Sequence, residues 1–247
     1  MTYVMSDIHG SSTRFESIMK QIELKPEDTL YVLGDVIDRR KDGIRILRKI
    51  MSMDNVKMLL GNHEYMMLNA LDRTGEEIHS YKHDLSLWYR NGGQVTHEYL
   101  KRIRKSIRKE VFEFLHSLPI NIPIEVNNQK YLLVHAAPES MYPGFAFKYD
   151  SPTQFAVWCR ARPYLLEQED TIIVFGHTPT TEYQNNNPLE IWVTKRLIGI
   201  DCGCAYPPPE AQGSRPAYGR LACLRLDDMK VFYSEENIPE GVEPFDW

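Results

Sequence analysis

The chain has 247 residues, of which 43% are hydrophobic and 26% are charged, and its formal net charge is −5 at pH 7. This length suffices for one full hydrophobic core, and the acidic balance argues against nucleic acid as the main partner. No apolar run approaches the roughly 20 residues that a membrane span needs, so no membrane partner is expected. The four cysteines favour reduced thiols in a cytoplasmic protein, with a redox or metal role as the alternative.

The first half of the chain alternates predicted strands and helices. Strands are expected at residues 2–5, 30–33 and 56–60, where short apolar runs end at glycine-containing turns. Because the first strand begins at residue 2, no signal peptide is expected. The two helices that follow the first two strands have apolar faces formed by Phe15, Ile18, Met19 and Ile22, and by Ile44, Leu47, Ile50 and Met51. Ser11 or Ser12 can cap the first helix. This order predicts a sheet that is parallel, at least locally.

Residues 66–118 are predicted to form a mainly helical insertion within a single domain that spans residues 1–247. The last helix of the insertion has an apolar side formed by Leu100, Ile103, Ile107, Val111, Phe114, Leu115 and Leu118. Its basic residues fall mostly on the other side: Lys101, Arg102, Arg104, Lys105, Arg108 and Lys109. They predict a solvated basic face, with a docking surface for acidic or phosphorylated partners as the alternative. The aromatic turn at 88–93 is expected to be a packed corner.

The second half contains further predicted strands at residues 131–134, 171–175, 196–201, 221–226 and 230–233. No long helix separates the last three, so this half is predicted to be largely antiparallel. The proline-rich loop at 206–218 is either a plain connection or a rim that shapes the active site.

Polar residues whose side chains can bind a metal ion follow five of the predicted strands. They are Asp7, His9, Asp35, Asn62, His135 and His177. Ligands gather beyond the carboxyl ends of strands in such sheets, and this donor set suits divalent manganese, iron or zinc. Six ligands exceed the need of one ion but suffice for two if Asp35, in the middle of the series, bridges them. Taken singly, each histidine would more often be structural.

Two ions about 4 Å apart can generate a hydroxide for in-line attack on phosphorus. His63 is placed to protonate the leaving group, and Asp38 can hold the tautomer of that histidine. Arg39 and Arg160 can clamp the phosphoryl oxygens through their guanidinium groups, although each arginine alone would more often be a surface residue.

At this point a family resemblance is evident. The motifs that carry it are Asp7-Ile8-His9-Gly10, Gly34-Asp35-Val36-Ile37-Asp38-Arg39, Gly61-Asn62-His63-Glu64, Val134-His135-Ala136-Ala137 and Gly176-His177-Thr178-Pro179. They resemble the PPP-type serine/threonine phosphatases of the calcineurin-like metallophosphoesterase superfamily. Within that branch, residues 88–93 and the segment Trp158-Cys159-Arg160 are similar to motifs of the compact bacterial and phage-type members.

The resemblance implies an α/β fold, a four-layer αββα sandwich with two mixed sheets. It implies Asp7, His9 and Asp35 on one metal ion, and Asp35, Asn62, His135 and His177 on a second. It further implies His63 as general acid, supported by Asp38, and Arg39, Arg160 and Asn62 on the substrate phosphate. Manganese is the expected ion, with iron, zinc or nickel as alternatives.

The resulting functional prediction is a metal-dependent phosphomonoesterase, specifically a serine/threonine protein phosphatase that acts on phosphorylated proteins or peptides. Thr178 stands where many related phosphodiesterases carry a further ligand histidine, which favours monoester over diester hydrolysis. The alternative is a small-molecule phosphohydrolase such as a symmetrical dinucleoside tetraphosphatase. A third hypothesis, a non-catalytic module that binds phosphoproteins, is disfavoured by the intact set of ligands and arginines.

Overall fold

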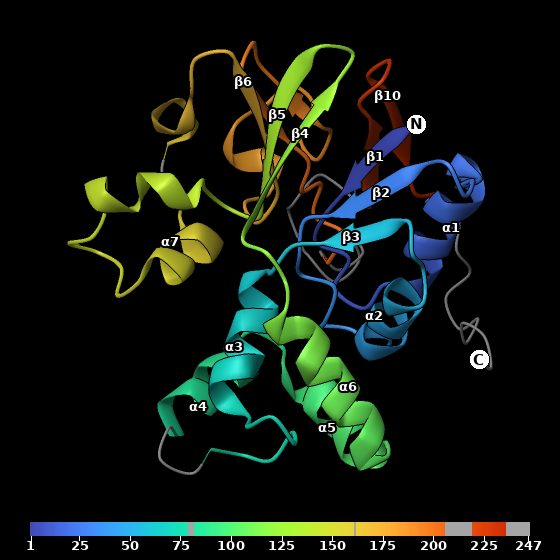
Figure 1. Ribbon diagram of the computed structural model, residues 1–247, viewed down its shortest axis with the longest axis vertical. Coiled ribbons are helices and arrows are strands. Elements are labelled where there is room, and N and C mark those ends of the chain that lie inside the picture. The colour runs from blue at the N-terminus through green and yellow to red at the C-terminus, as the bar shows by residue number, and fades with distance from the viewer. Residues whose placement is uncertain (79–81, 161, 206–218, 236–247) are drawn as a thin grey trace.

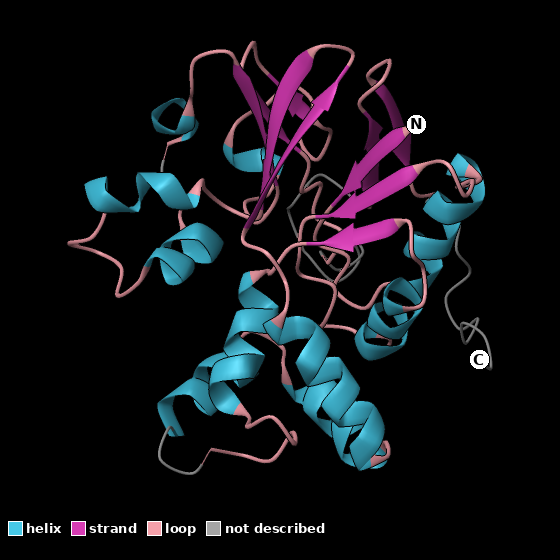
Figure 2. Cartoon of the chain, in the orientation of Figure 1, coloured by secondary structure: helices cyan, strands magenta, loops and turns pink. Residues whose placement is uncertain are grey.

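The computed structural model describes residues 1–78, 82–160, 162–205 and 219–235 of the chain. Two five-stranded sheets pack face to face, and helices cover their outer faces (Figures 1 and 2). The helices described are α1 (Ser12–Ile22), α2 (Gly43–Met51), α3 (Asn62–Ala70), α4 (Lys82–Arg90), α5 (Gln94–Arg102), α6 (Lys105–His116) and α7 (Pro152–Trp158). Short 3-10 helices are η1 (Glu139–Gly144), η2 (Pro163–Leu166) and η3 (Thr180–Glu182). The proline-rich loop at 206–218 lies outside the described residues.

The first sheet has the strand order β10-β9-β1-β2-β3. Its strands are β1 (Thr2–Met5), β2 (Thr29–Val32), β3 (Val56–Met58), β9 (Ala222–Arg225) and β10 (Lys230–Tyr233). The strands β1, β2 and β3 are parallel, as the alternation of strands and helices predicts, because α1 and α2 carry the chain back between them. The strand β9 runs antiparallel to both β1 and β10.

The second sheet has the order β4-β5-β6-β8-β7. Its strands are β4 (Asn121–Val126), β5 (Gln129–Val134), β6 (Thr171–Phe175), β7 (Trp192–Val193) and β8 (Leu197–Gly199). The prediction of a largely antiparallel second half holds only in part for this sheet: β4 pairs antiparallel with β5, and β7 with β8, but β6 pairs in parallel with both β5 and β8. Parallel pairing needs a long crossover, and the connection from β5 to β6 provides one that contains α7.

Apolar side chains between the two sheets form the central core. Val4 and Leu33 from the first sheet pack in one buried cluster with Leu133 and Val174 from the second. A second cluster joins the first sheet to α1, α2 and the helices α3–α6, and a third joins the second sheet to α7. The predicted four-layer αββα fold with two mixed sheets is therefore confirmed.

The predicted long helix ending at residue 118 is two helices. The backbone is extended at Ile103 and Arg104, with ψ values of 159° and 145°, so α5 ends at Arg102 and α6 begins at Lys105. The apolar spacing continues across this break, which is why the sequence pattern suggested one helix. That residues 66–118 are an insertion in a single domain stays a prediction.

The basic residues of these helices do not all face solvent. Arg108 is buried, and its guanidinium donates to Glu76 at 3.3 Å beneath the turn at Gly75. The prediction of a solvated basic face is therefore wrong for Arg108, which forms an ion pair with Glu76 in the loop before α4.

The structure also bears on the cap of α1, the cysteines and the length of the helices. Ser11 occupies the N-cap position of α1 but makes no side-chain capping bond, and the hydroxyl of Ser12 instead donates to Asp42 at 2.8 Å. All four cysteines are buried. Within the described ranges, each helix is too short or too polar to cross a bilayer.

Candidate active site

The carboxyl ends of β1, β2 and β3 meet those of β5 and β6 at one edge of the sandwich. Backbone hydrogen bonds join the loops that follow these strands: the N–H of His9 donates to the carbonyl of Asp35, and that of Gly176 to the carbonyl of His135, both at 2.9 Å. Parallel strands bring their carboxyl ends together, so five segments that are distant in the sequence converge here.

Four of the predicted ligands have left-handed backbone conformations. Their φ values are 55° at Asp7, 48° at His9, 55° at Asp35 and 63° at His177. Non-glycine residues rarely adopt this region, and they persist there only where the surrounding structure imposes it. The turn after each strand thus redirects the side chain toward the common centre.

Two glycines allow these loops to approach one another closely. A Cβ on Gly61 would collide with the backbone nitrogen and the carboxylate of Asp35, and a Cβ on Gly176 would collide with the side chain of Asp7. Neither position has room for a side chain, which explains why a glycine stands at each of them.

His9 presents a lone pair to two carboxylates. Its Nδ1 lies 3.1 Å from the carbonyl of Ile37, which can only accept, so Nδ1 carries the proton. Burial and the nearby His63 hold the pKa of His9 well below its usual value, so the ring is neutral. Its Nε2 therefore faces Asp35 at 3.7 Å and Asp7 at 4.0 Å as an electron-pair donor.

His135 presents a lone pair in the same way. Its Nδ1 donates to the carbonyl of Leu33 at 2.6 Å, and its Nε2 lies 3.0 Å from Oδ1 of Asn62 and 3.5 Å from Oδ1 of Asp35. Nδ1 of His177 approaches the same Asn62 oxygen at 2.8 Å. Burial lowers the pKa of both histidines. Nε2 of His135 thus presents its lone pair toward the oxygen atoms of Asn62 and Asp35.

This donor set fits two divalent cations. Ligand atoms of His9, Asp35 and His63 lie within 4.8 Å of one another, as do those of Asp35, His135 and His177. Asp35 belongs to both groups: its Oδ2 faces His9 and its Oδ1 faces His135, which is the geometry of a bridging carboxylate. Burial and the neighbouring Asp7 raise the pKa of Asp35, a cost that bound cations would remove. The ligand assignment itself stays a prediction.

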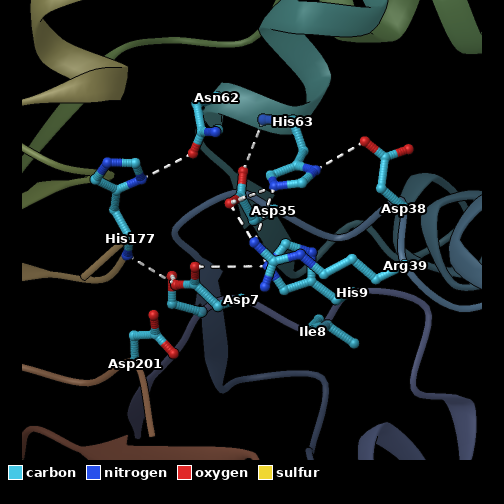
Figure 3. Close-up of polar contacts among 12 residues, drawn as sticks. Asp7, Ile8, His9, Asp35, Asp38, Arg39, Asn62, His63, His177 and Asp201 are labelled. Atoms are coloured by element: carbon cyan, nitrogen blue, oxygen red, sulfur yellow. Dashed lines mark hydrogen bonds and ion pairs between the residues drawn. The ribbon is translucent and has the colours of Figure 1, made fainter. Parts of the chain in front are cut away.

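His63 stands between the candidate metal ligands and the solvent-exposed Arg39. Its Nδ1 lies 2.8 Å from Asp38, and its Nε2 accepts from Arg39 at 3.3 Å (Figure 3). The same carboxylate of Asp38 accepts from Nε1 of Trp88 at 2.8 Å. Burial raises the pKa of Asp38 to about 7 and lowers that of His63. Asp38 thus fixes the orientation of the ring through Nδ1 and leaves Nε2 facing Arg39 and the site.

Arg160 approaches the site from the loop after α7. It is exposed, its Nη1 donates to Thr178 at 3.1 Å, and its charge contributes to lowering the pKa of His177 after the effect of burial. Arg39 is exposed as well. Both guanidinium groups therefore border the buried ligands while remaining accessible to a phosphoryl group.

Asp201 lies beside Asp7 in the site, although the sequence did not single it out (Figure 3). It is buried, and burial together with Asp7 raises its pKa well above the usual range. Its Oδ1 accepts the N–H of Gly203 at 2.9 Å. The available signal was its position at the end of a predicted strand, the same position that Asp7 and Asp35 occupy.

Glu64 was also overlooked as a member of the site. Its carboxylate is buried and accepts the N–H groups of Asp35, Val36 and Gly61 at 2.9 to 3.2 Å. It therefore holds the loop after β2 against the start of α3. The signal was its place as the third residue of α3, from which a glutamate can reach back to the N-cap residue.

Comparisons with known proteins agree with this geometry. A family model described as calcineurin-like phosphoesterase matches residues 2–199. The symmetrical bis(5'-nucleosyl)-tetraphosphatase of Pectobacterium atrosepticum is 36% identical over 69 residues, which are 27% of this chain and 25% of that protein. The enzyme of the same name from Acidovorax sp. (strain JS42) is 40% identical over 70 residues, or 28% and 25% of the two chains. The alignments thus span about a quarter of these relatives.

Among solved structures, the chain is similar to a proposed diadenosine tetraphosphatase. The TM-score is 0.60 at 18% identity, with 94% of this chain and 91% of the other covered. At this level of identity the likeness concerns the fold alone.

These comparisons correct the functional prediction. The prediction of a PPP-type serine/threonine protein phosphatase is wrong, because the curated relatives are symmetrical tetraphosphatases. The motifs specify a phosphoryl-transfer centre that different substrates can share, and they do not specify what lies beyond the phosphate. The coarser part of the prediction holds: the protein is a metallophosphoesterase, a hydrolase whose family implies divalent metal ions. Since the family model covers most of its length, the chain belongs to the calcineurin-like phosphoesterase family.

Proposed function

We propose that the protein hydrolyses dinucleoside tetraphosphates symmetrically. One water molecule would cleave the central P–O–P bridge, and the products would be two nucleoside diphosphates. The observation that carries this proposal is the local identity of 36–40% to symmetrical bis(5'-nucleosyl)-tetraphosphatases. The exposed Arg39 and Arg160 at the rim of the site support it, because a tetraphosphate bears several negative charges.

Six side chains would hold the metal ions: Asp7, His9, Asp35, Asn62, His135 and His177. We propose manganese as the native ion, because mixed carboxylate, imidazole and amide ligands suit it. Two bound cations would supply Lewis-acid chemistry that activates water and stabilises charge on the phosphoryl oxygens.

The protein's own residues would complete the reaction. Arg39 would leave His63 to bind a phosphoryl oxygen, with Arg160 on the other side. His63 Nε2 would then be free to carry a proton toward the oxygen of the leaving nucleoside diphosphate, while Asp38 holds the opposite ring nitrogen. Asn62 would contribute its amide both to the metal and to the phosphate.

The test is a reconstitution assay. The protein would be stripped with chelator and reloaded separately with manganese, iron, zinc, nickel or magnesium. Diadenosine tetraphosphate should be converted to ADP alone, fastest with manganese. Formation of ATP and AMP would contradict symmetrical cleavage. Turnover of p-nitrophenyl phosphate without turnover of the dinucleotide would contradict the substrate class while leaving the metal chemistry intact.

A further inference from the structure

A groove of about 540 Å³ lies between α3, α4 and α7. This volume falls in the range of about 300–1,000 Å³ that is typical of small-molecule sites. Residues of all three helices line it, together with two residues next to them: Tyr65, Met66, Leu68, Asn69, Ile78, His83, Asp84, Leu87, Asp150, Gln154 and Trp158. None of them belongs to the set that we assign to the metals or to phosphate.

The helix α3 leads from the active site into this groove. Asn62, at its first turn, faces the candidate metal ligands, and Tyr65 and Asn69 follow at positions i+3 and i+7 on the same face. Seven residues of helix span about 10 Å, which is roughly the reach of a nucleoside attached to a diphosphate. A substrate phosphate held at Asn62 would thus place its nucleoside along this face.

The helix α7 forms the opposite wall and also ends at the active site. Gln154 and Trp158, four residues apart, both line the groove. The ring of Trp158 meets that of His177 edge to face, with 6.0 Å between centroids, and Arg160 follows two residues later. Trp158 is therefore a wall shared by the metal site and the groove. The contacts between α3 and α7 close the space between these two walls.

The chemistry of the groove indicates its occupant. Its walls offer aromatic rings at Tyr65 and Trp158, an amide at Asn69, and carboxylates at Asp84 and Asp150. No lysine or arginine stands among the described lining residues, so the groove does not attract phosphate. Aromatic faces stack on bases, while amides and carboxylates accept hydrogen bonds from amino and hydroxyl groups.

We propose that this groove binds one nucleoside of the substrate, with the base against Tyr65 and Trp158 and the polyphosphate directed toward Arg39 and Arg160. This inference rests on the proposed function and names the part of the chain that would recognise the nucleoside. The division of charge supports it: the cationic side chains border the metal ligands, and the acidic ones lie in the groove.

Product inhibition tests the proposal without requiring turnover of a dinucleotide. ADP and inorganic phosphate would be compared as inhibitors of p-nitrophenyl phosphate hydrolysis by the metal-loaded protein. The ratio of their inhibition constants isolates the contribution of the nucleoside from that of the metal site. In Tyr65→Ala the advantage of ADP over phosphate should fall roughly 10-fold, because one stacking face is lost.

The matched control is Tyr99→Ala, since Tyr99 is also half-buried but lines a separate cavity between α1 and α2. It should keep the wild-type ratio. Asn69→Leu, which keeps the branching at Cγ but removes the amide, is a second test if Tyr65→Ala folds poorly, and it should also lower the ratio.

An unchanged ratio in a folded Tyr65→Ala protein and in Asn69→Leu would overturn the nucleoside site. This result is distinct from failure of the proposed function, which would appear as absence of diadenosine tetraphosphate turnover in the wild-type protein. If the wild-type protein cleaves the dinucleotide but ADP and phosphate inhibit it equally, the proposed function stands and the nucleoside site in the groove is disproved.

Discussion

The carboxylate of Asp35 has its two oxygens directed at different histidines, Oδ2 at His9 and Oδ1 at His135. If it bridges two ions, Asp35→Asn should weaken both sites together, because an amide offers only one metal-binding oxygen and no charge. Metal analysis should find fewer than one ion per chain. Asp42→Asn changes a buried aspartate at the start of α2, away from the predicted ligands, and should retain the wild-type metal content. Two ions in Asp35→Asn would disprove bridging.

A second residue-scale prediction concerns His63. His63→Asn should lower turnover of phenyl phosphate roughly 10²–10⁴-fold, because a poor leaving group needs protonation. The loss should be smaller for diadenosine tetraphosphate, since a nucleoside diphosphate leaves as a weaker base. Kinetics on both substrates provide the measurement, and His116→Asn, at an exposed histidine at the end of α6, is the control. Equal losses on the two substrates would argue against an acid role.

At the scale of elements, α4 and the turn after it hold the residues on either side of His63. Trp88 is fully buried and donates to Asp38 at 2.8 Å, and the carbonyl of Gly92 accepts the N–H of Arg39 at 3.0 Å. The segment 88–93, which the sequence suggested as a packed corner, therefore holds the two loop residues that flank the chemistry.

Trp88→Phe should lower turnover of phenyl phosphate about 10-fold, the scale of one lost hydrogen bond to a charged group. The loss should not add to that of Asp38→Asn, because both changes act through the orientation of His63. Trp192→Phe, a half-buried tryptophan on the second sheet, is the matched control. Fully additive losses in the double variant would indicate a general structural role for Trp88.

The junction between β3 and α3 gives a further element-scale prediction. Gly61→Ala should destabilise the protein and reduce its metal content, because the new Cβ would meet Asp35 and Glu64. Gly144→Ala, at a glycine with open space around its Cβ position, should change neither property. Thermal unfolding and metal analysis of the two variants make the comparison, and full metal content in Gly61→Ala would show that the loops can separate.

At the scale of the whole molecule, the buried acids predict how stability depends on pH without metal. Burial raises the pKa of both Asp38 and Glu64 to about 7, against ordinary values of about 4. The folded state thus keeps protons that the unfolded chain has released, so stability is lost as pH rises through about 7. The buried histidines have lowered pKa values and act in the opposite direction, but only up to about pH 6.5.

In chelator, the Tm should therefore fall between about pH 6.5 and pH 7.5. Excess manganese should reverse this trend, because cations bind the ionised carboxylates and neutral imidazoles and displace protons. Thermal unfolding across this range, with and without metal, tests both statements. A Tm that rises from pH 6.5 to pH 7.5 in chelator would contradict the buried-acid account.

Much of the site could be predicted from the sequence because its determinants are local. A metal-type ligand follows each of the short apolar strands β1, β2, β3, β5 and β6 within a few residues, and a glycine accompanies it after all of them except β5. The parallel order of the first three strands follows from the helices between them, and their carboxyl ends must then share one edge. The predicted ligands Asp7, His9, Asp35, Asn62, His135 and His177 accordingly lie together.

The tertiary structure decided what depends on contacts between distant segments. Trp88 reaches Asp38 across 50 residues, Asp201 reaches the neighbourhood of Asp7 only through the second sheet, and α3 meets α7 only after the sandwich has formed. No local pattern encodes such pairs, because they arise from packing. The same reason explains why the substrate was predicted wrongly: local motifs determine the phosphoryl chemistry, whereas the surfaces that select a substrate are assembled from helices far apart in the sequence.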